Sequence, residues 1–107
     1  MTYFTNEYGL RQKDMDYMLN VFKSMPEIEQ VIIYGSRAVG SFEKGSDIDL
    51  AISGEMITNL QIGRIHSMLE NEGPTFLLFD VLHYNTLKNQ ALKKQIDEKG
   101  KLIYTVK

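Results

Sequence analysis

The sequence predicts a small α/β (α+β) fold, in which helices flank a mixed β-sheet. Three observations carry this prediction. Apolar residues at helical spacing alternate along the chain with short β-branched runs, and glycine or proline separates them. The chain has 107 residues, of which 43% are hydrophobic, enough for one core and too few for two. We therefore expect one domain over residues 1–107.

The first elements are a helix and a strand. Residues 15–25 carry apolar side chains at helical spacing, so we expect a helix that ends near residue 24 or 25, ahead of Pro26. Residues 31–34 form a β-branched and aromatic run that stops at Gly35, which is typical of a buried strand.

A loop and an alternating strand follow. Residues 35–46 hold three glycines and predict a loop with one helical turn. Residues 46–52 alternate in polarity, which predicts a strand with two unlike faces. We expect one face to carry Ile48, Leu50 and Ile52, and the other to carry Asp47, Asp49 and Ala51.

The second half of the chain predicts two more helices and two more strands. A helix is expected over residues 55–71. The nearly all-apolar stretch 75–82 predicts a strand covered on both faces. A helix capped by Asn85 and ending near residue 99 should lead into a last strand over residues 102–106.

Composition excludes several classes of protein. The net charge of -2 gives no strong nucleic-acid signal, and the absence of cysteine excludes a disulfide scaffold and a zinc ribbon. No apolar run approaches the roughly 20 residues of a membrane helix, and no secretory signal pattern begins the sequence. We expect a cytoplasmic protein without a membrane partner.

Two carboxylates two residues apart are the first candidate for chemistry. On a strand, Asp47 and Asp49 share a face about 6–7 Å apart, where they repel each other by roughly 3 kcal/mol at an effective dielectric near 20. A solvated strand face reduces that repulsion, and a divalent cation such as Mg²⁺ removes it. The pair alone leaves both interpretations open.

A third acid favours the metal interpretation. Asp80 is the single charge in the apolar stretch 75–82, and buried charges persist when they are paired or metal-bound. If its strand lies beside that of Asp47 and Asp49, the three carboxylates converge. The turn Gly35-Ser36 would bring backbone amides close to phosphate oxygens, and Arg37 would add a charged contact.

These motifs resemble a known family. Gly35-Ser36, ten further residues and then Asp47-x-Asp49, together with Phe79-Asp80-Val81, are similar to the minimal nucleotidyltransferase (MNT) family of the DNA polymerase β-like superfamily. The resemblance implies that Asp47, Asp49 and Asp80 are catalytic and hold two Mg²⁺ ions. It further implies that Gly35, Ser36 and Arg37 bind the nucleotide.

The resemblance also implies a reaction and a partner. An acceptor hydroxyl attacks the α-phosphate of ATP, so that AMP is transferred and pyrophosphate leaves. The chain has no residues for an acceptor domain, and members of this family pair with a small helical HEPN protein. The implied role is the antitoxin of a type VII toxin–antitoxin pair that modifies a tyrosine of its HEPN toxin.

Two other functions remain open. The same fold would serve as a binding module that neutralises a partner by occlusion, although binding alone needs no cluster of three acids. Transfer to a small molecule would need an acceptor site that a homo-oligomer could build.

Overall fold

The chain folds as helices on both faces of a four-stranded sheet. The computed structural model describes residues 5–106. In chain order its elements are α1 (Gln12–Lys23), β1 (Gln30–Tyr34), α2 (Ser36–Val39), β2 (Ile48–Ser53), α3 (Asn59–Asn71), β3 (Phe79–His83), the 3₁₀ turn η1 (Tyr84–Thr86), α4 (Gln90–Lys99) and β4 (Lys101–Thr105). This order and the mixed sheet confirm the predicted fold class.

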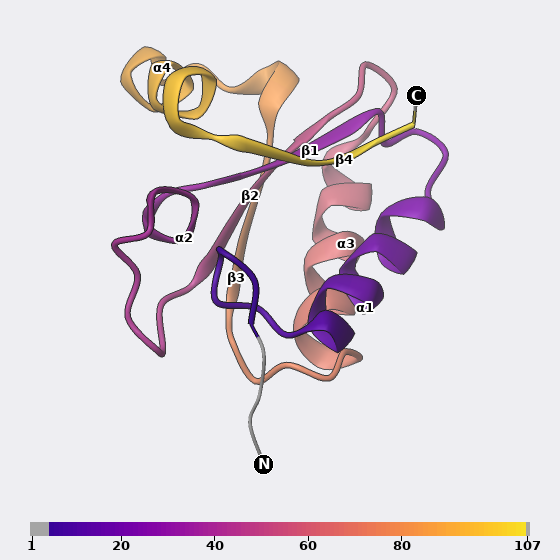
Figure 1. Cartoon of the computed structure of the whole chain (residues 1–107). Helices are drawn as coiled ribbons and strands as arrows, with labels where there is room; N and C mark the ends of the chain where they lie inside the picture. The colour runs from indigo at the N-terminus through magenta and orange to yellow at the C-terminus, as the bar shows by residue number, and fades with distance from the viewer. Residues whose placement is uncertain (1–4, 107) are drawn as a thin grey trace.

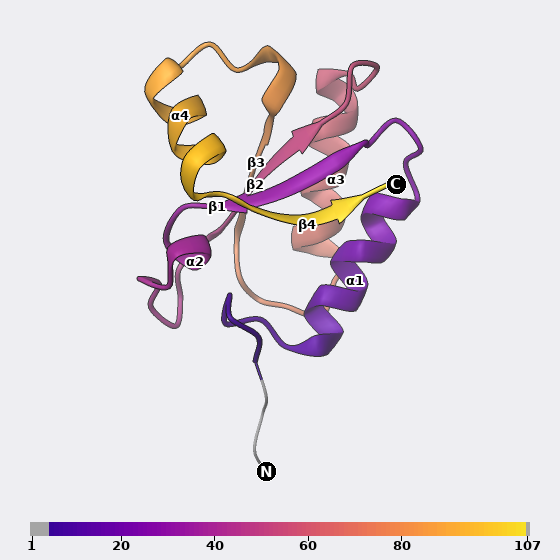
Figure 2. The same cartoon turned by 45° about the horizontal axis from the view of Figure 1, so that its top comes forward.

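The sheet has the strand order β3-β2-β1-β4, in which β2 and β3 run parallel and the other neighbours run antiparallel. Figures 1 and 2 show α1 and α3 together on one side of the sheet, with α2 and α4 on the other. A parallel pair needs a crossover connection, and α3 supplies it between β2 and β3.

Each face of the sheet packs its own apolar cluster. Ile48, Leu50 and Ile52 of β2 are fully buried in the larger cluster, with side chains of α1 and α3. Ala51 packs in a smaller cluster with Tyr34 of β1 and Ile96 of α4. The predicted alternation is therefore confirmed for residues 48–52, whereas Asp47, predicted to share the second face of the strand, lies just before it.

Two predicted helix starts were wrong. Helix α3 begins at Asn59, later than the predicted residue 55, because Thr58 and Gln61 form a capping box. Helix α4 is capped by Asn89, whose Oδ1 accepts the Leu92 amide. Asn85, the predicted cap, lies in η1 and accepts the Gly54 amide.

The predicted buried strand over residues 75–82 was only partly correct. Strand β3 begins at Phe79, and the preceding Phe76 is fully exposed while Leu78 is more than half exposed. Both exposed residues lie in the segment that precedes β3, where the chain has not yet entered the edge strand of the sheet. An apolar run does not by itself show whether its residues lie within a buried strand or in an exposed segment that leads into a strand.

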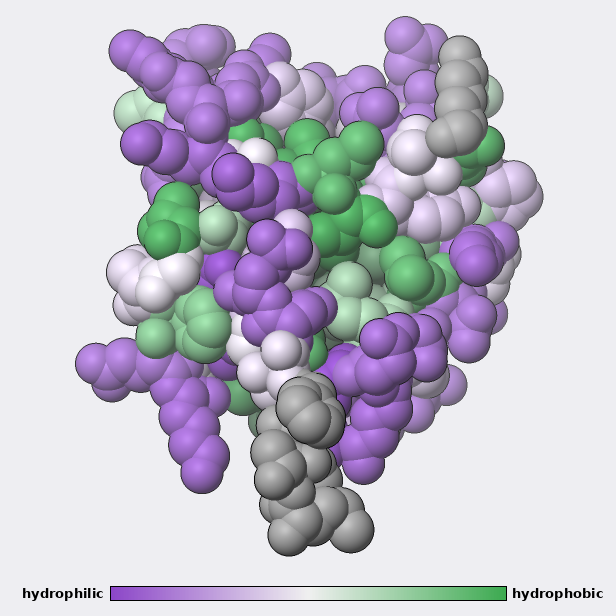
Figure 3. Space-filling view, in the orientation of Figure 1, coloured by the Kyte–Doolittle hydropathy of each residue, from purple (hydrophilic) through white to green (hydrophobic). Residues whose placement is uncertain are grey.

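The other sheet edge also carries exposed apolar surface. Figure 3 shows one face of the molecule, on which most side chains are hydrophilic and apolar side chains gather over β4. Leu102 of β4 is 53% exposed. Within residues 5–106, no helix is long and apolar enough to span a membrane.

Gly63 lies in the middle of α3 and offers a stability test. It is exposed, and a Cβ added there would meet no atom within 4 Å. Glycine costs a helix interior about 1 kcal/mol relative to alanine. We expect Gly63→Ala to raise the free energy of unfolding by about 0.5–1 kcal/mol, measured by urea denaturation. A destabilised variant would mean that this position is packed against something.

Candidate active site

Tyr34 and two aspartates lie in register across three strands, on the face of the sheet that α4 partly covers. Tyr34 of β1 pairs with Asp49 of β2, and Asp49 pairs with Asp80 of β3. Neighbouring strands lie about 4.8 Å apart, so the two carboxylates start from adjacent backbone positions. Asp47 lies one residue before β2 and is exposed. We call Asp47, Asp49 and Asp80 the acid row.

Asp49 occupies the centre of the acid row and has the most perturbed environment. Partial burial raises its pKa, and the charges of Asp80 and Asp47 raise it further. Burial also raises the pKa of the Tyr34 hydroxyl, and the charges of Asp80 and Asp49 raise it further. These shared effects indicate that the three carboxylates repel one another across one small region.

Gly35 forms the turn that faces Asp49. Its backbone angles, φ 74° and ψ -155°, lie in a region almost restricted to glycine. A Cβ at this position would overlap the Oδ2 atom of Asp49, so the carboxylate packs directly against the glycine backbone. The close approach to this glycine is made by Asp49 of the protein itself, and the approach of a ligand remains a prediction.

Ser36 follows as the first residue of the single-turn helix α2. Its carbonyl accepts hydrogen bonds from the amides of Gly40 and Ser41, which close the turn. The side chain is half-buried. Ser36 thus lies next to the glycine that touches Asp49, as a phosphate contact would require.

Arg37 does not occupy the position expected of a phosphate contact. The residue is 1% exposed, and its guanidinium donates to the backbone carbonyls of Tyr8, Lys44 and Ser46. It also stacks over the Phe42 ring, 5.0 Å from the ring centroid. The prediction of Arg37 as a nucleotide-binding residue is therefore corrected, because its donors are directed at backbone oxygens.

Asp80 lies in the predicted place but not in the predicted environment. The register places it beside Asp49, yet its side chain is exposed. Asp80 is therefore not a buried charge that requires a metal ion. Its position is fixed through the preceding residue, Phe79, whose amide donates to Glu70 Oε2 at 2.7 Å and whose carbonyl lies 2.8 Å from His66 Nε2.

This attachment of β3 to α3 predicts a pH effect. The hydrogen bond from the Phe79 amide is the main cause of a lowered pKa at Glu70, and the neighbouring His66 lowers this pKa further. A carboxylate with a lowered pKa in the folded state stabilises the fold above its usual pKa, 4.5, and loses that effect as the pH falls. We expect wild type to lose more stability than Glu70→Gln between neutral pH and about pH 4, measured by urea denaturation. The exposed Glu98→Gln serves as a control, and equal losses in all three proteins would contradict the prediction.

The acid row has the donor chemistry of a site for a hard cation. Among residues 5–106, no three histidine or acidic side chains are gathered tightly enough to hold one ion, so the predicted three-carboxylate set is not preassembled. Mg²⁺ needs only one or two carboxylates and completes its shell with water and phosphate oxygens. Asp49 and Asp47, two residues apart, supply the one or two carboxylates that this requires, with Asp80 beside Asp49.

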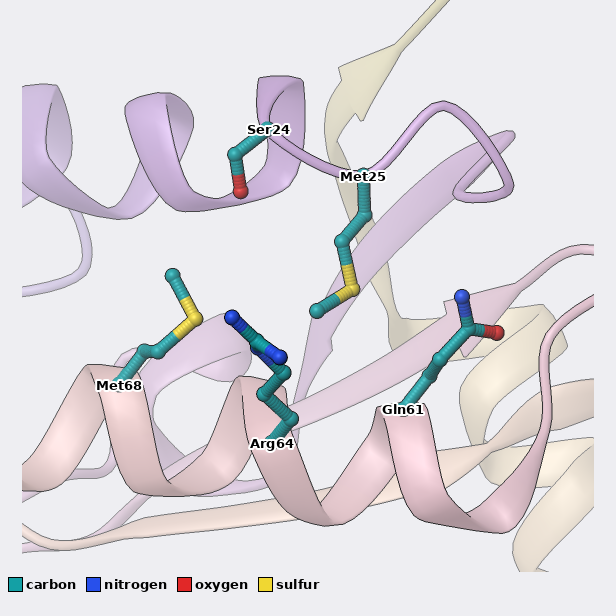
Figure 4. A pocket seen from close by; sticks show the side chains of 5 residues that line it. All are labelled: Ser24, Met25, Gln61, Arg64 and Met68. Carbon is teal, nitrogen blue, oxygen red and sulfur yellow. The ribbon is translucent and has the colours of Figure 1, made fainter.

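Two cavities among the described residues contain none of the acid row, and the larger, about 440 Å³, is lined in part by Gly9, Lys44 and Phe76. A cavity of about 350 Å³ lies between the end of α1 and α3, and Figure 4 shows Arg64 reaching across it from α3. Its lining residues are Ser24, Met25, Gln61, Arg64 and Met68. These elements cover the face of the sheet opposite the acid row. The acid row itself is a surface feature.

Three residues around the site were missed by sequence reasoning. Tyr34 lies in the row beside Asp49, while His66 and Glu70 hold the strand of Asp80. The spacing of His66 and Glu70, one helical turn apart, places them on one face of the helix. Their backbone partner is distant in sequence, so no local pattern identifies it.

The mixed sheet, the glycine turn and the acid row together define the nucleotidyltransferase fold. A family model described as polymerase beta, nucleotidyltransferase matches residues 17–107. The chain belongs to this family.

Solved structures with the same fold are distant in sequence. A toxin–antitoxin structure with AMP-PNP is 17% identical, with a TM-score of 0.73, over 87% of this chain and 74% of that one. The MntA-HepT toxin–antitoxin is 15% identical, with a TM-score of 0.68, over 89% and 73%. A tri-AMPylated Shewanella oneidensis HEPN toxin in complex with MNT antitoxin is 16% identical, with a TM-score of 0.67, over 88% and 71%. No curated protein sequence matches the chain.

Proposed function

We propose that this protein transfers a nucleoside monophosphate, AMP from ATP, to a hydroxyl group of a partner protein. The observation that carries the proposal is the contact between the Asp49 carboxylate and the Gly35 backbone, with Asp80 in register beside Asp49. This contact puts the oxygen ligands for a cation next to the turn where phosphates would bind.

Each part of the site has a role in this reaction. Asp49 and Asp47 would hold the cations, Mg²⁺ in our proposal, which when bound neutralise phosphate charge and align the attack. Gly35 and Ser36 would supply backbone amides to the phosphates from the turn that the Asp49 carboxylate contacts. Asp80 is exposed at the edge of the row, where it would accept the proton of the attacking hydroxyl.

The relatives support the choice of nucleotide and acceptor. One was solved with AMP-PNP, and another contains an AMPylated HEPN toxin with its MNT antitoxin. We therefore propose that the acceptor is a tyrosine of a HEPN-type toxin, and that this chain acts as the antitoxin. An acceptor on another protein also agrees with the open surface of the acid row.

The test is a labelling reaction. The wild-type chain would be incubated with α-labelled ATP, Mg²⁺ and the protein encoded beside it, in parallel with the double variant Asp47→Asn, Asp49→Asn. We expect label on the partner with wild type alone, at a tyrosine identified by mass spectrometry. EDTA should abolish the reaction.

Two results would contradict this proposal. Tight binding of the partner without label, under any nucleotide or metal, would favour neutralisation by occlusion. Label on a small-molecule hydroxyl and none on the partner would favour a small-molecule transferase.

A further inference from the structure

We infer that Arg37 is a positioning residue, which holds Asp47 in place by joining the loop over residues 40–47 to the N-terminal turn over residues 5–11. This inference rests on the proposed role of Asp47 as a metal ligand. It adds a task that neither the family nor the proposed function gives to this arginine.

The fork of the guanidinium holds the loop next to Asp47. The Nε and Nη2 atoms of Arg37 donate to the carbonyl of Ser46 at 3.0 and 2.9 Å. Ser46 directly precedes Asp47, so the two bonds fix the peptide that orients the Asp47 backbone. Because Asp47 lies outside β2, no ladder hydrogen bond of that strand holds it.

The remaining donor holds a distant segment. Nη1 of Arg37 donates to the Tyr8 carbonyl at 2.8 Å, in a buried contact. The turn around Tyr8 is compact, since Asn6 Oδ1 accepts the amides of Tyr8 and Leu10. One side chain thus connects two segments that are about 30 residues apart, and its loss should loosen both.

The Phe42 ring completes the arrangement. It covers the guanidinium and lies so close to Gly9 that a Cβ there would meet the ring. The charges of Asp14 and Asp47 also act on Arg37 and partly compensate the cost of its burial. Each of the three guanidinium nitrogens donates to a backbone carbonyl, and the residue is 1% exposed, so the side chain is committed to the protein interior.

Two measurements on the full chain test the inference. The first is amide hydrogen exchange by mass spectrometry, in which Arg37→Met should raise exchange at least about tenfold in residues 5–11 and 40–47 together. The second is Mn²⁺ binding followed by electron paramagnetic resonance, with Mn²⁺ alone as the probe. The affinity should fall about tenfold, as it does when an outer partner of a metal ligand is removed.

Matched variants separate geometry from charge. Arg37→Lys keeps the charge but cannot span the Tyr8 and Ser46 carbonyls, so we expect it to restore neither property. Arg64→Met removes an exposed arginine from α3 and should change neither. If Arg37→Met does not fold, Phe42→Leu keeps every hydrogen bond and should produce smaller changes of the same kind.

Three results would overturn the inference. Faster exchange spread evenly over the chain with unchanged Mn²⁺ affinity would mean that Arg37 only stabilises the fold. Unchanged exchange with lowered Mn²⁺ affinity would mean that Arg37 does not act by holding these two segments. Full recovery in Arg37→Lys would mean that charge alone matters. Wild type that binds Mn²⁺ but transfers no label would contradict the proposed function and leave this inference standing.

Discussion

Asp49→Asn is expected to lower nucleotidyl transfer by about 10³-fold or more while making the protein more stable. A catalytic cation lowers the barrier by several kcal/mol, and each 1.36 kcal/mol corresponds to a factor of ten. Asparagine keeps the shape that packs against Gly35 but removes the charge of the residue that we propose as the central metal ligand. Activity and stability should therefore move in opposite directions.

The sign of the stability change follows from the pKa of Asp49. Burial, then Asp80 and Asp47, raise this pKa in the folded state. The folded chain then binds the proton more tightly than the unfolded chain, so stability falls as the pH rises through the usual range for an aspartate and stays lowered at neutral pH. Asparagine has no proton to lose, and this cost disappears.

Urea denaturation at neutral pH, together with the labelling reaction, measures both effects. Asp16→Asn is the matched control, because Asp16 is an exposed aspartate of α1 outside the site. It should leave transfer unchanged. A destabilised Asp49→Asn would show that this carboxylate is a structural acid, and full activity would exclude it as a ligand.

Gly35→Ala should be the most destabilising single change in the site. The backbone angles of Gly35 cost another residue about 1–3 kcal/mol, and the added methyl group would also collide with the Asp49 carboxylate. We expect a loss of about 3 kcal/mol, which lowers Tm by about 10–20 °C in a domain of this size. Transfer should fall as well, because Asp49 must move.

Gly40→Ala separates strain from collision. Gly40 also has a positive φ, 83°, but a Cβ there would meet nothing within 4 Å. Its substitution should cost only about 1 kcal/mol and leave transfer nearly unchanged. Equal losses of activity in the two variants would mean that the contact between Gly35 and Asp49 has no special importance.

The fold and the acid row could be predicted in part because both depend on local periodicity. The alternation over residues 46–52 required one buried face, which put Asp47 and Asp49 on the other. Pro26 and the glycine turn fixed where elements end. The position of Asp80 beside Asp49 was left open by the sequence, because it depends on the order and register of β2 and β3.

The errors have a different origin, since they concern partners that no short segment reveals. The apolar run before Asp80 looked buried, yet β3 lies at the sheet edge, so Phe76 and Asp80 are exposed. Arg37 looked free to bind a phosphate because its carbonyl partner at Tyr8 is far away in sequence. The two helix starts are a different case, because Thr58 with Gln61 and Asn89 with Leu92 are local capping pairs that the sequence does contain.

The pairing of β1 with β4 also sets when the protein can complete its fold during synthesis. Val31 of β1 pairs with Tyr104 of β4, so one side of β1 stays unpaired until a segment roughly 70 residues later has been translated. At about 5–20 residues per second, the ribosome takes about 4 to 14 s to cover that distance. Throughout this interval the nascent chain carries an isoleucine-rich strand with an open edge. The acid row therefore gains a finished sheet beneath it only when β4 arrives.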